Sequence, residues 1–257
     1  MTSTGDLPVG QAGDRPARGA RMAGPAASVW DLPEHGTRGP RPRHDRAAIT
    51  AIAVRIADAE GPEAATMRRI AKELGVATMS LYTYVPAKDH LVQLMVDHLA
   101  AEYTYPAVPA PDPRSAIADL ARQARDVARR HPWLGQLLHR PVPPGPGGLR
   151  YLDYFLGLLA GSGLDTGAKL EVIAIISGFA TMYGAMQPAP ASKGNETPSA
   201  QASAQIQPFI RAAASGDYPN LAAALATAEP QRTQDDVFES SIQRLIDGAR
   251  LPDEPSS

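Results

Sequence analysis

The sequence predicts an all-α protein: a three-helix N-terminal domain followed by a larger helical bundle. Apolar residues recur at three- and four-residue spacing in several segments between positions 45 and 249, as expected for amphipathic helices. No segment shows the two-residue alternation of a half-buried strand, and clusters of proline and glycine separate the helical segments. We therefore expect helices joined by loops, with no internal repeat.

The composition excludes several classes of site. The chain has 257 residues and no cysteine, so it has room for two modest domains but for no disulfide, thiol nucleophile or cysteine-bound metal. The N-terminus lacks the basic and apolar regions of a secretory signal, and we therefore expect a cytoplasmic protein.

Charge is distributed unevenly along the chain. Positions 38–88 hold nine basic and five acidic residues, a net charge of +4, whereas the whole chain carries −2. A locally basic segment in a mildly acidic protein is expected when one module meets phosphate and the rest does not.

Residues 1–44 are predicted to form a disordered extension. Positions 1–42 contain seven glycines and six prolines but few large apolar side chains, so they cannot bury enough surface to offset the entropy of ordering. Arg38, Arg41 and Arg43 precede the first helix. They either reach an adjacent DNA groove or belong to a solvated tail.

The first predicted domain covers residues 45–105. Its first helix runs from Asp45 to Gly61, and a short second helix has Thr66 as its N-cap and Gly75 as its C-terminal stop. A third short helix covers 78–85, and a long helix covers 87–103. Four prolines between positions 106 and 113 then mark the domain boundary.

The second predicted domain covers residues 106–250 and precedes a disordered tail at 251–257. Helices are expected at 117–131, 133–139, 149–160, 165–186, 202–214, 220–226 and 233–249. We expect 165–186 to be the longest buried helix. Prolines at positions 188 and 190 leave its apolar part too short to span a membrane.

Residues 66–85 place two short helices around a glycine turn, which is the arrangement of a DNA-reading helix-turn-helix. Ala71 is small where the two helices approach most closely, and Gly75 makes the turn. Four apolar residues supply the core between the helices: Ile70, Leu74, Val76 and Leu81.

The outer face of the third helix carries short or aromatic side chains that can touch base edges and phosphates: Thr78, Met79, Ser80, Tyr82, Thr83 and Tyr84. The alternative is that Tyr82 and Tyr84 are core aromatics. Because they flank a single threonine, they cannot both face the same core, and we expect at least one to meet DNA.

From Ile49 to Leu99 the chain resembles the DNA-binding domain of the TetR family of bacterial regulators, above all in the run TMRRIAKELGVATMSLYTYVPAKDHLVQLM. The features that match are Thr66 and Arg68 at the start of the second helix, Gly75-Val76 in the turn, Leu81-Tyr82 in the recognition helix, and Lys88 with Leu91 after it.

The resemblance implies operator contacts at Thr66, Arg68, Thr78, Met79, Ser80, Tyr82, Thr83, Tyr84 and Lys88. Arg68 and Lys88 would clamp phosphates, while the side chains at 78–80 and Thr83 would read bases. Ala77 departs from the family pattern, in which a hydroxyl residue often caps the recognition helix. Thr78 is therefore either the cap or a base contact.

For residues 106–250 the resemblance implies a bundle that dimerises and holds a ligand pocket. Helices 165–186 and 233–249 would form a four-helix bundle between two copies, although a monomer core would also explain their apolar faces. Large side chains expected at the pocket are Trp133, Leu137, Tyr151, Tyr154, Phe155, Phe179, Met182 and Tyr183. Ordinary core packing is the alternative for each, and their character favours a small hydrophobic effector.

Other chemistry finds little support. The six histidines lack metal-ligand spacing, and the glycine-rich runs near 144–148 and 161–163 lack the context of a phosphate-binding loop. We expect no metal, no cofactor and no enzymatic activity. The sequence predicts a transcriptional regulator that binds operator DNA specifically, a repressor released by its effector. The alternative is an architectural or interaction protein that binds DNA without a ligand.

Overall fold

The computed structural model describes residues 28–32, 45–106, 112–137, 142–187, 198–227 and 232–249. The described residues form α helices and 3-10 turns and contain no strand, so the predicted all-α class is confirmed. The first part comprises η1 (Val29–Asp31), α1 (Arg46–Glu60), η2 (Pro62–Ala64), α2 (Met67–Leu74), α3 (Thr78–Leu81), α4 (Lys88–Leu99) and η3 (Ala100–Glu102).

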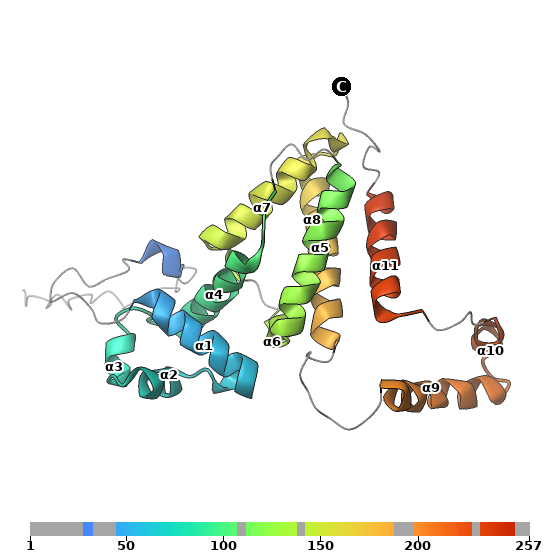
Figure 1. Cartoon of the computed structure of the whole chain (residues 1–257), viewed down its shortest axis with the longest axis horizontal. Helices are drawn as coiled ribbons and strands as arrows, with labels where there is room; N and C mark the ends of the chain where they lie inside the picture. Colours follow the sequence, from blue (N-terminus) through green and yellow to red (C-terminus); the bar gives the residue numbers. More distant parts are fainter. Residues whose placement is uncertain are drawn as a thin grey trace, which may run out of the picture.

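The second part comprises α5 (Pro113–Arg130), α6 (Trp133–Leu137), α7 (Pro146–Leu158), η4 (Ala160–Ser162), α8 (Thr166–Met186), α9 (Pro198–Ala214), α10 (Pro219–Ala226) and α11 (Gln234–Gly248). Figure 1 shows α1–α4 at one end, α5, α7 and α8 in the middle, and α11 beyond them. The predicted tail at 251–257 lies outside the described residues.

Side-chain caps mark the starts of five of the described α helices. The side chains of Asp45, Thr66, Asp112 and Asp165 each accept a hydrogen bond from the first turn of the helix that follows. Thr233 forms a reciprocal capping box with Asp236 at the start of α11. These caps satisfy backbone N–H groups that have no partner inside the helix. The predicted N-cap role of Thr66 is confirmed.

Two predicted helices end earlier than expected. α3 ends at Leu81 and residues 82–84 form a turn. Pro86 disfavours a helical conformation at Val85, which opposes the predicted end of the helix at residue 85. The helix predicted at 87–103 ends as α4 at Leu99. The Thr104 N–H donates to Gln123 Oε1 of α5 at 2.7 Å, so the chain leaves the helix to meet α5.

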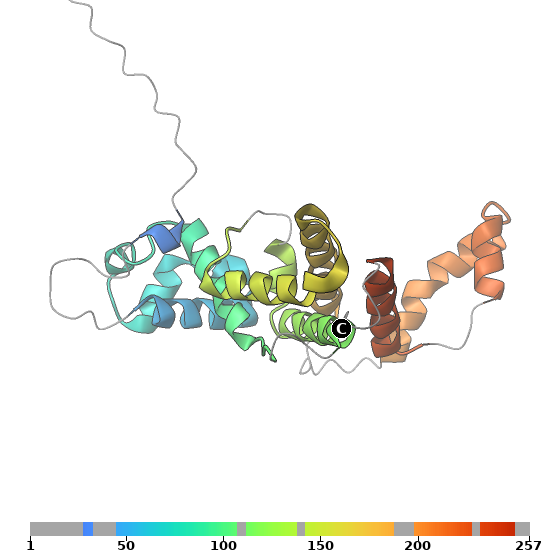
Figure 2. The ribbon, with the colours of Figure 1, turned by 90° about the horizontal axis from the view of Figure 1, so that it is seen from above.

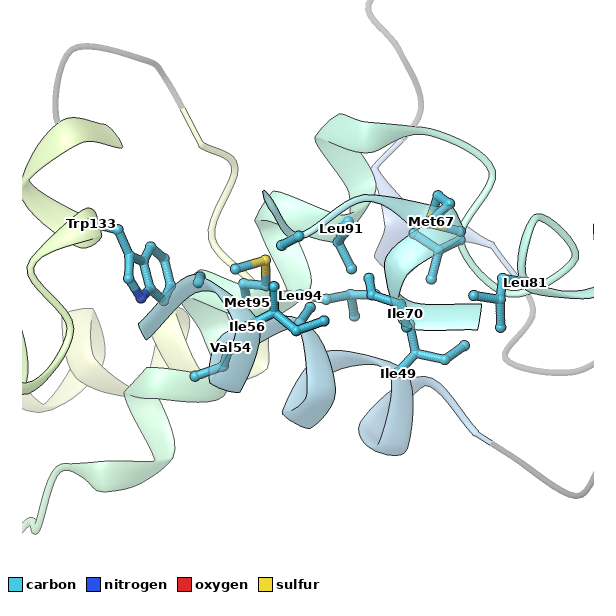
Figure 3. Close-up of a cluster of buried hydrophobic side chains, with 14 of the residues drawn as sticks. Ile49, Val54, Ile56, Met67, Ile70, Leu81, Leu91, Leu94, Met95 and Trp133 are labelled. Carbon is cyan, nitrogen blue, oxygen red and sulfur yellow. The ribbon is translucent and has the colours of Figure 1, made fainter. Parts of the chain in front are cut away.

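The first hydrophobic core lies between α1, α2, α3 and α4 (Figure 3). Ile49, Ile70 and Leu81 are 0–1% exposed. Residues from the other part of the chain join it, since Val127 of α5 and Trp133 of α6 are both buried in the same cluster. The base of the N-terminal module is therefore packed directly against the start of the bundle.

The second core is formed by α5, α7, α8 and α11. α5 and α8 form the most extensive helix pair, and Gly184 lets α8 approach the backbone of Arg125 closely. Phe238, Ile242 and Ile246 of α11 are fully buried against these helices. The apolar face of α11 is thus already covered within one chain.

α8 was expected to be buried, and it is buried on one face only. It is the longest helix described, and among the described residues it is the one helix long and apolar enough to cross a membrane by length and composition. Of its most apolar stretch, 28% is buried. It packs on α5, α6, α7 and α11, as a helix of a bundle core does. Its other face exposes Ile175, Met182 and Met186, which are 49–78% exposed.

α9 and α10 pair with each other and stand apart from α5, α7 and α8, beyond α11 (Figures 1 and 2). Ile206, Phe209 and Ile210 on α9 are exposed, and their spacing places them on one face. The sequence predicted both helices but assigned no role to that face.

The prediction of disorder across residues 1–44 is wrong for residues 28–32, which form an ordered turn packed on α4. Val29 is fully buried in the first core, and Trp30 packs at its edge. These are two large apolar side chains in an otherwise small and polar stretch. No other residue of this extension lies in the described part of the chain, which resumes at Asp45.

Candidate functional site

The helix-turn-helix is formed by α2, the turn at Gly75 and α3. Gly75 has the left-handed conformation, with φ 68° and ψ 32°, which glycine adopts without steric cost. The Val76 N–H then donates to the Ala71 carbonyl at 3.0 Å. Ala71 and Leu81 are each 1% exposed, so the predicted steric roles of Ala71 and Gly75 are confirmed.

The outer surface of α3 and the following turn presents the predicted DNA-reading side chains. Met79 is 76% exposed and Tyr82 is 42% exposed, while Ser80 and Thr83 are also exposed. Tyr84 is half-buried against the first core. The two tyrosines therefore point to different environments, as their spacing predicted, and Tyr82 is the more exposed of the two.

Thr78 does not cap α3. The N-cap residue is Ala77, and no side chain accepts a hydrogen bond there. Because Thr78 is the first helical residue and half-buried, its hydroxyl is not used as the cap. This removes the conflict between a capping role and a base contact.

Three further predicted contacts surround this surface. Thr66 is exposed while it caps α2, and Arg68 is exposed in the first turn of that helix. Lys88 Nζ lies 2.5 Å from Glu63 Oε2, in a pair whose side chains are 55% and 85% exposed. Exposed pairs contribute about 0–1 kcal/mol, so a phosphate can replace Glu63 as the partner of Lys88.

A cavity of about 210 Å³ lies between the N-terminal module and the bundle. Its wall combines α4, η3, α5, α6, the loop before α7, α7 and α8: Gln93, Val96, Asp97, Leu99, Ala100, Tyr103, Val127, Leu134, Val142, Pro143, Pro144, Gly145, Gly148, Tyr151 and Ser177. The wall is mainly apolar, with a few polar groups.

The polar groups of the cavity hold one another in place. Tyr151 Oη lies 2.7 Å from Ser177 Oγ, which joins α7 to α8, and burial raises the Tyr151 pKa to about 12. Asp97 Oδ1 accepts the Gly148 N–H at 2.8 Å. Tyr103 packs edge-on against Tyr151, with ring centroids 5.0 Å apart. The cavity wall therefore offers hydroxyl groups and a carboxylate.

Most side chains predicted for the ligand pocket lie elsewhere. Tyr151 lines this cavity, but Tyr154 and Phe155 are buried in the second core. Phe179 and Tyr183 pack on Phe238 instead. The remaining predictions also miss this cavity: Trp133 and Leu137 border a much smaller one beside α4, and Met182 is 49% exposed on the outer face of α8.

Sequence reasoning missed the contribution of α4 to the cavity. Large aromatic residues were favoured, whereas the wall takes Gln93, Val96 and Asp97 from α4 and the loop at 142–145 from before α7. One signal was available. Gln93 is a polar residue next to Leu94 and Met95 on a buried part of the helix, and a buried polar residue needs a specific partner.

A polar junction connects the two parts of the chain near this cavity. His131, at the end of α5, lies between Asp58 of α1 and Glu102 of η3. The Trp133 indole donates to the same Asp58 oxygen at 2.7 Å. Among the described residues, no group of three His, Cys, Asp or Glu side chains could hold a metal ion.

Comparison with known proteins identifies the family of this chain. Residues 49–95 match the family described as "Bacterial regulatory proteins, tetR family", and residues 105–251 match "Tetracyclin repressor-like, C-terminal domain". The second match alone covers more than half of the chain. The chain belongs to the TetR family of bacterial transcriptional regulators. Its helix-turn-helix is thus the DNA-binding part of a transcriptional regulator.

Relatives of this TetR-family regulator include the HTH-type transcriptional repressor DrrR1 of Streptomyces coeruleorubidus. The two are 33% identical over 228 residues, which cover 87% of this chain and 83% of that protein. The TetR-family protein ActR of Streptomyces coelicolor has been solved in complex with actinorhodin and with (S)-DNPA. The first complex is 26% identical with a TM-score of 0.66, and covers 82% of this chain and 97% of that one. The complex with (S)-DNPA is 25% identical with a TM-score of 0.65, and the match covers 82% of this chain and 98% of that one.

Proposed function

We propose that this regulator represses transcription and that a small, mainly hydrophobic effector in the 210 Å³ cavity releases it from its operator. One observation carries the proposal: the cavity is walled by α4 of the DNA-binding module together with α7 and α8 of the bundle. A ligand there touches both parts, and can favour one arrangement of them over another. The naming of DrrR1 as a repressor and the ligand complexes of ActR support the same function.

The side chains of the cavity wall indicate which chemical class of effector would fit. Its apolar surface favours a largely hydrophobic body, and the Tyr151–Ser177 hydroxyl pair can bind a hydroxyl or carbonyl group. Asp97 disfavours a negative charge in the cavity, because two close carboxylates repel each other. We therefore expect a neutral or cationic compound rather than an anionic one.

Release follows from the spacing of two recognition segments. In a homodimer, two such segments bind successive major grooves when they lie about 34–36 Å apart. We propose that 165–186 and 233–249 form the dimer interface. The exposed face of α8 supports this proposal, and α11 would contribute its outer face, since its apolar face is buried within the chain. An effector that favours another spacing lowers operator affinity.

The side chains divide into two groups at the DNA. Arg68 and Lys88 are exposed cations that clamp phosphates, while Ser80 and Thr83 offer hydroxyls to base edges next to Met79 and Tyr82. Thr66, Thr78 and Tyr84 border the same surface and complete the proposed contacts. The regulator would act in the cytoplasm, with no cofactor other than the effector.

The test begins with a footprint on DNA upstream of the protein's own gene. Lys88→Ala should weaken binding to all duplexes alike and reduce the salt dependence, whereas Ser80→Ala and Thr83→Ala should reduce discrimination between operator and random DNA. Arg211→Ala, exposed on α9, serves as the matched charge control. Equal effects of all three substitutions on both DNAs would overturn the division of roles.

A second experiment tests the effector. A thermal-shift screen of neutral apolar compounds identifies ligands, and each is then assayed for release of the operator. Tyr151→Phe should weaken a hit that uses the hydroxyl pair. Compounds that bind in the cavity and leave operator affinity unchanged would instead support a DNA-binding protein without ligand control.

A further inference from the structure

Residues 28–32, named here the N-terminal clasp, are attached to α4 by specific contacts. Gln93 Oε1 accepts the Val29 N–H at 3.0 Å and the Ser28 hydroxyl at 3.2 Å. Val29 is fully buried, and Ser28 closes the turn through a capping box with Asp31. Figure 1 shows this turn beside the N-terminal module. The clasp lies outside both family matches, which begin at residues 49 and 105.

The clasp lies behind two residues of the cavity wall, Gln93 and Gly145. Gln93 lines the cavity and binds the clasp with the same side chain. Gly145 lines the cavity too, and a Cβ atom placed on it would overlap the Trp30 indole. A ligand that moves α4 or the loop before α7 therefore moves the surface against which Trp30 rests.

The other end of the clasp is connected to the recognition segment. Arg46 Nη1 donates to the Leu32 carbonyl at 3.2 Å, and Arg46 Nε donates to the Tyr84 carbonyl at 2.9 Å. Arg46 is 7% exposed, so both hydrogen bonds are shielded from water. Tyr84 belongs to the turn that ends α3. One buried side chain thus joins the clasp to the DNA-reading surface.

The clasp also has space on its outer side. A second cavity, of about 190 Å³, is bordered by Trp30, Arg46, Thr50 and Asp97. Trp30 borders this second cavity, and Asp97 borders both cavities. The indole therefore has open space on one side, while it also packs at the edge of the first core.

We propose that the N-terminal clasp couples occupancy of the cavity to the position of the recognition segment, through Gln93 and Gly145 on one side and Arg46 on the other. The proposal rests on the effector site proposed above. It assigns to this extension a regulatory role, carried by hydrogen bonds and by one close glycine contact.

The test uses Val96→Phe, which places a ring in the cavity from α4 and so imitates occupancy without a known effector. Ala101→Phe adds the same ring at an exposed position of η3 and is the matched control. The chain contains two tryptophans, so 5-fluorotryptophan labelling gives two ¹⁹F resonances, and Trp30→Phe assigns them. Hydrogen exchange of residues 78–85 reports on the recognition segment without DNA.

We expect Val96→Phe to shift the Trp30 resonance and to raise exchange at 78–85 by at least about fivefold, the lower end of usual allosteric coupling. Ala101→Phe should do neither. In a Gly145→Ala background, where the new methyl displaces Trp30, Val96→Phe should add less than about twofold, as expected when the coupled contact is already lost. Trp30→Ala provides a second background should Gly145→Ala fail to fold.

An unmoved Trp30 resonance in Val96→Phe, or equal exchange increases with and without the clasp contact, would overturn the proposal. Neither the ¹⁹F measurement nor the hydrogen-exchange measurement requires DNA, so both are independent of the operator assay. If the clasp responds as expected while operator affinity does not change, the proposed effector control fails and the clasp link stands.

Discussion

His131 Nδ1 lies 2.7 Å from Asp58 Oδ1 and thereby binds the end of α5 to α1. The other ring nitrogen lies 2.9 Å from Glu102 Oε1. One side chain of the bundle is thus held by two carboxylates of the N-terminal module.

We expect His131→Ala to lower the free energy of unfolding by about 1–2 kcal/mol, because the contacts of the ring with two carboxylates are lost. The value is moderate since Asp58 and Glu102 are 30% and 31% exposed and keep Trp133 and Arg130 as partners. Urea unfolding measures it. His98→Ala, at an exposed position of α4, should stay within about 0.5 kcal/mol. Similar losses from both would show that the junction contributes nothing specific.

A salt bridge between α5 and α11 should make stability depend on pH. Arg122 Nε and Nη2 each lie 2.7 Å from a carboxylate oxygen of Glu239, and this guanidinium holds the pKa of Glu239 below its ordinary value. A lowered pKa in the folded state stabilises the protein above the unfolded-state pKa, and this stabilisation is lost as pH falls through the folded-state pKa.

We therefore expect Glu239→Gln to be less stable than the parent at pH 7, and the difference to shrink below about pH 4.5, the ordinary value for glutamate. Unfolding free energies measured by urea between pH 3 and pH 7 test this. A difference that stays constant across this range would mean that the carboxylate charge plays no part.

Two glycines of α8 should respond oppositely to a methyl group. A Cβ atom on Gly184 would overlap the Arg125 carbonyl oxygen, whereas a Cβ atom on Gly178 meets nothing within 4 Å. We expect Gly184→Ala to cost about 1–3 kcal/mol by overpacking α5 against α8. Gly178→Ala should stabilise the helix by up to about 1 kcal/mol in the monomer. Thermal and urea unfolding of the two variants measure these changes in stability. Equal changes for both variants would contradict the close approach of Gly184 to Arg125.

The exposed face of α8 should control oligomeric state. Ile175 and Met182 are 54% and 49% exposed, on a part of the helix without charged residues. Ile175→Glu places a charge at the centre of the proposed dimer interface, and should weaken self-association by at least about tenfold, as loss of a buried anchor does. Leu149→Glu, 53% exposed on α7, is the matched control. Light scattering after size exclusion measures both; a dimer that survives Ile175→Glu would place the interface elsewhere.

The helices and the helix-turn-helix could be predicted from the sequence, because the signals for both are local. The helical spacing of apolar residues, the cap at Thr66 and the left-handed stop at Gly75 each act within a few residues. The separation of Tyr82 from Tyr84 is local as well, because it follows from the direction in which successive side chains leave the backbone.

The cavity, the polar junction and the clasp could not be predicted in this way, because they depend on how the helices pack together. Gln93 meets Val29 from 64 positions away, and His131 meets Asp58 from 73 positions away. No periodic pattern encodes such pairs, since each depends on how finished helices pack. The predicted pocket aromatics show the same limit: size and apolar character placed Phe155 and Phe179 inside the protein, but a filled core and a cavity wall draw on the same residue types.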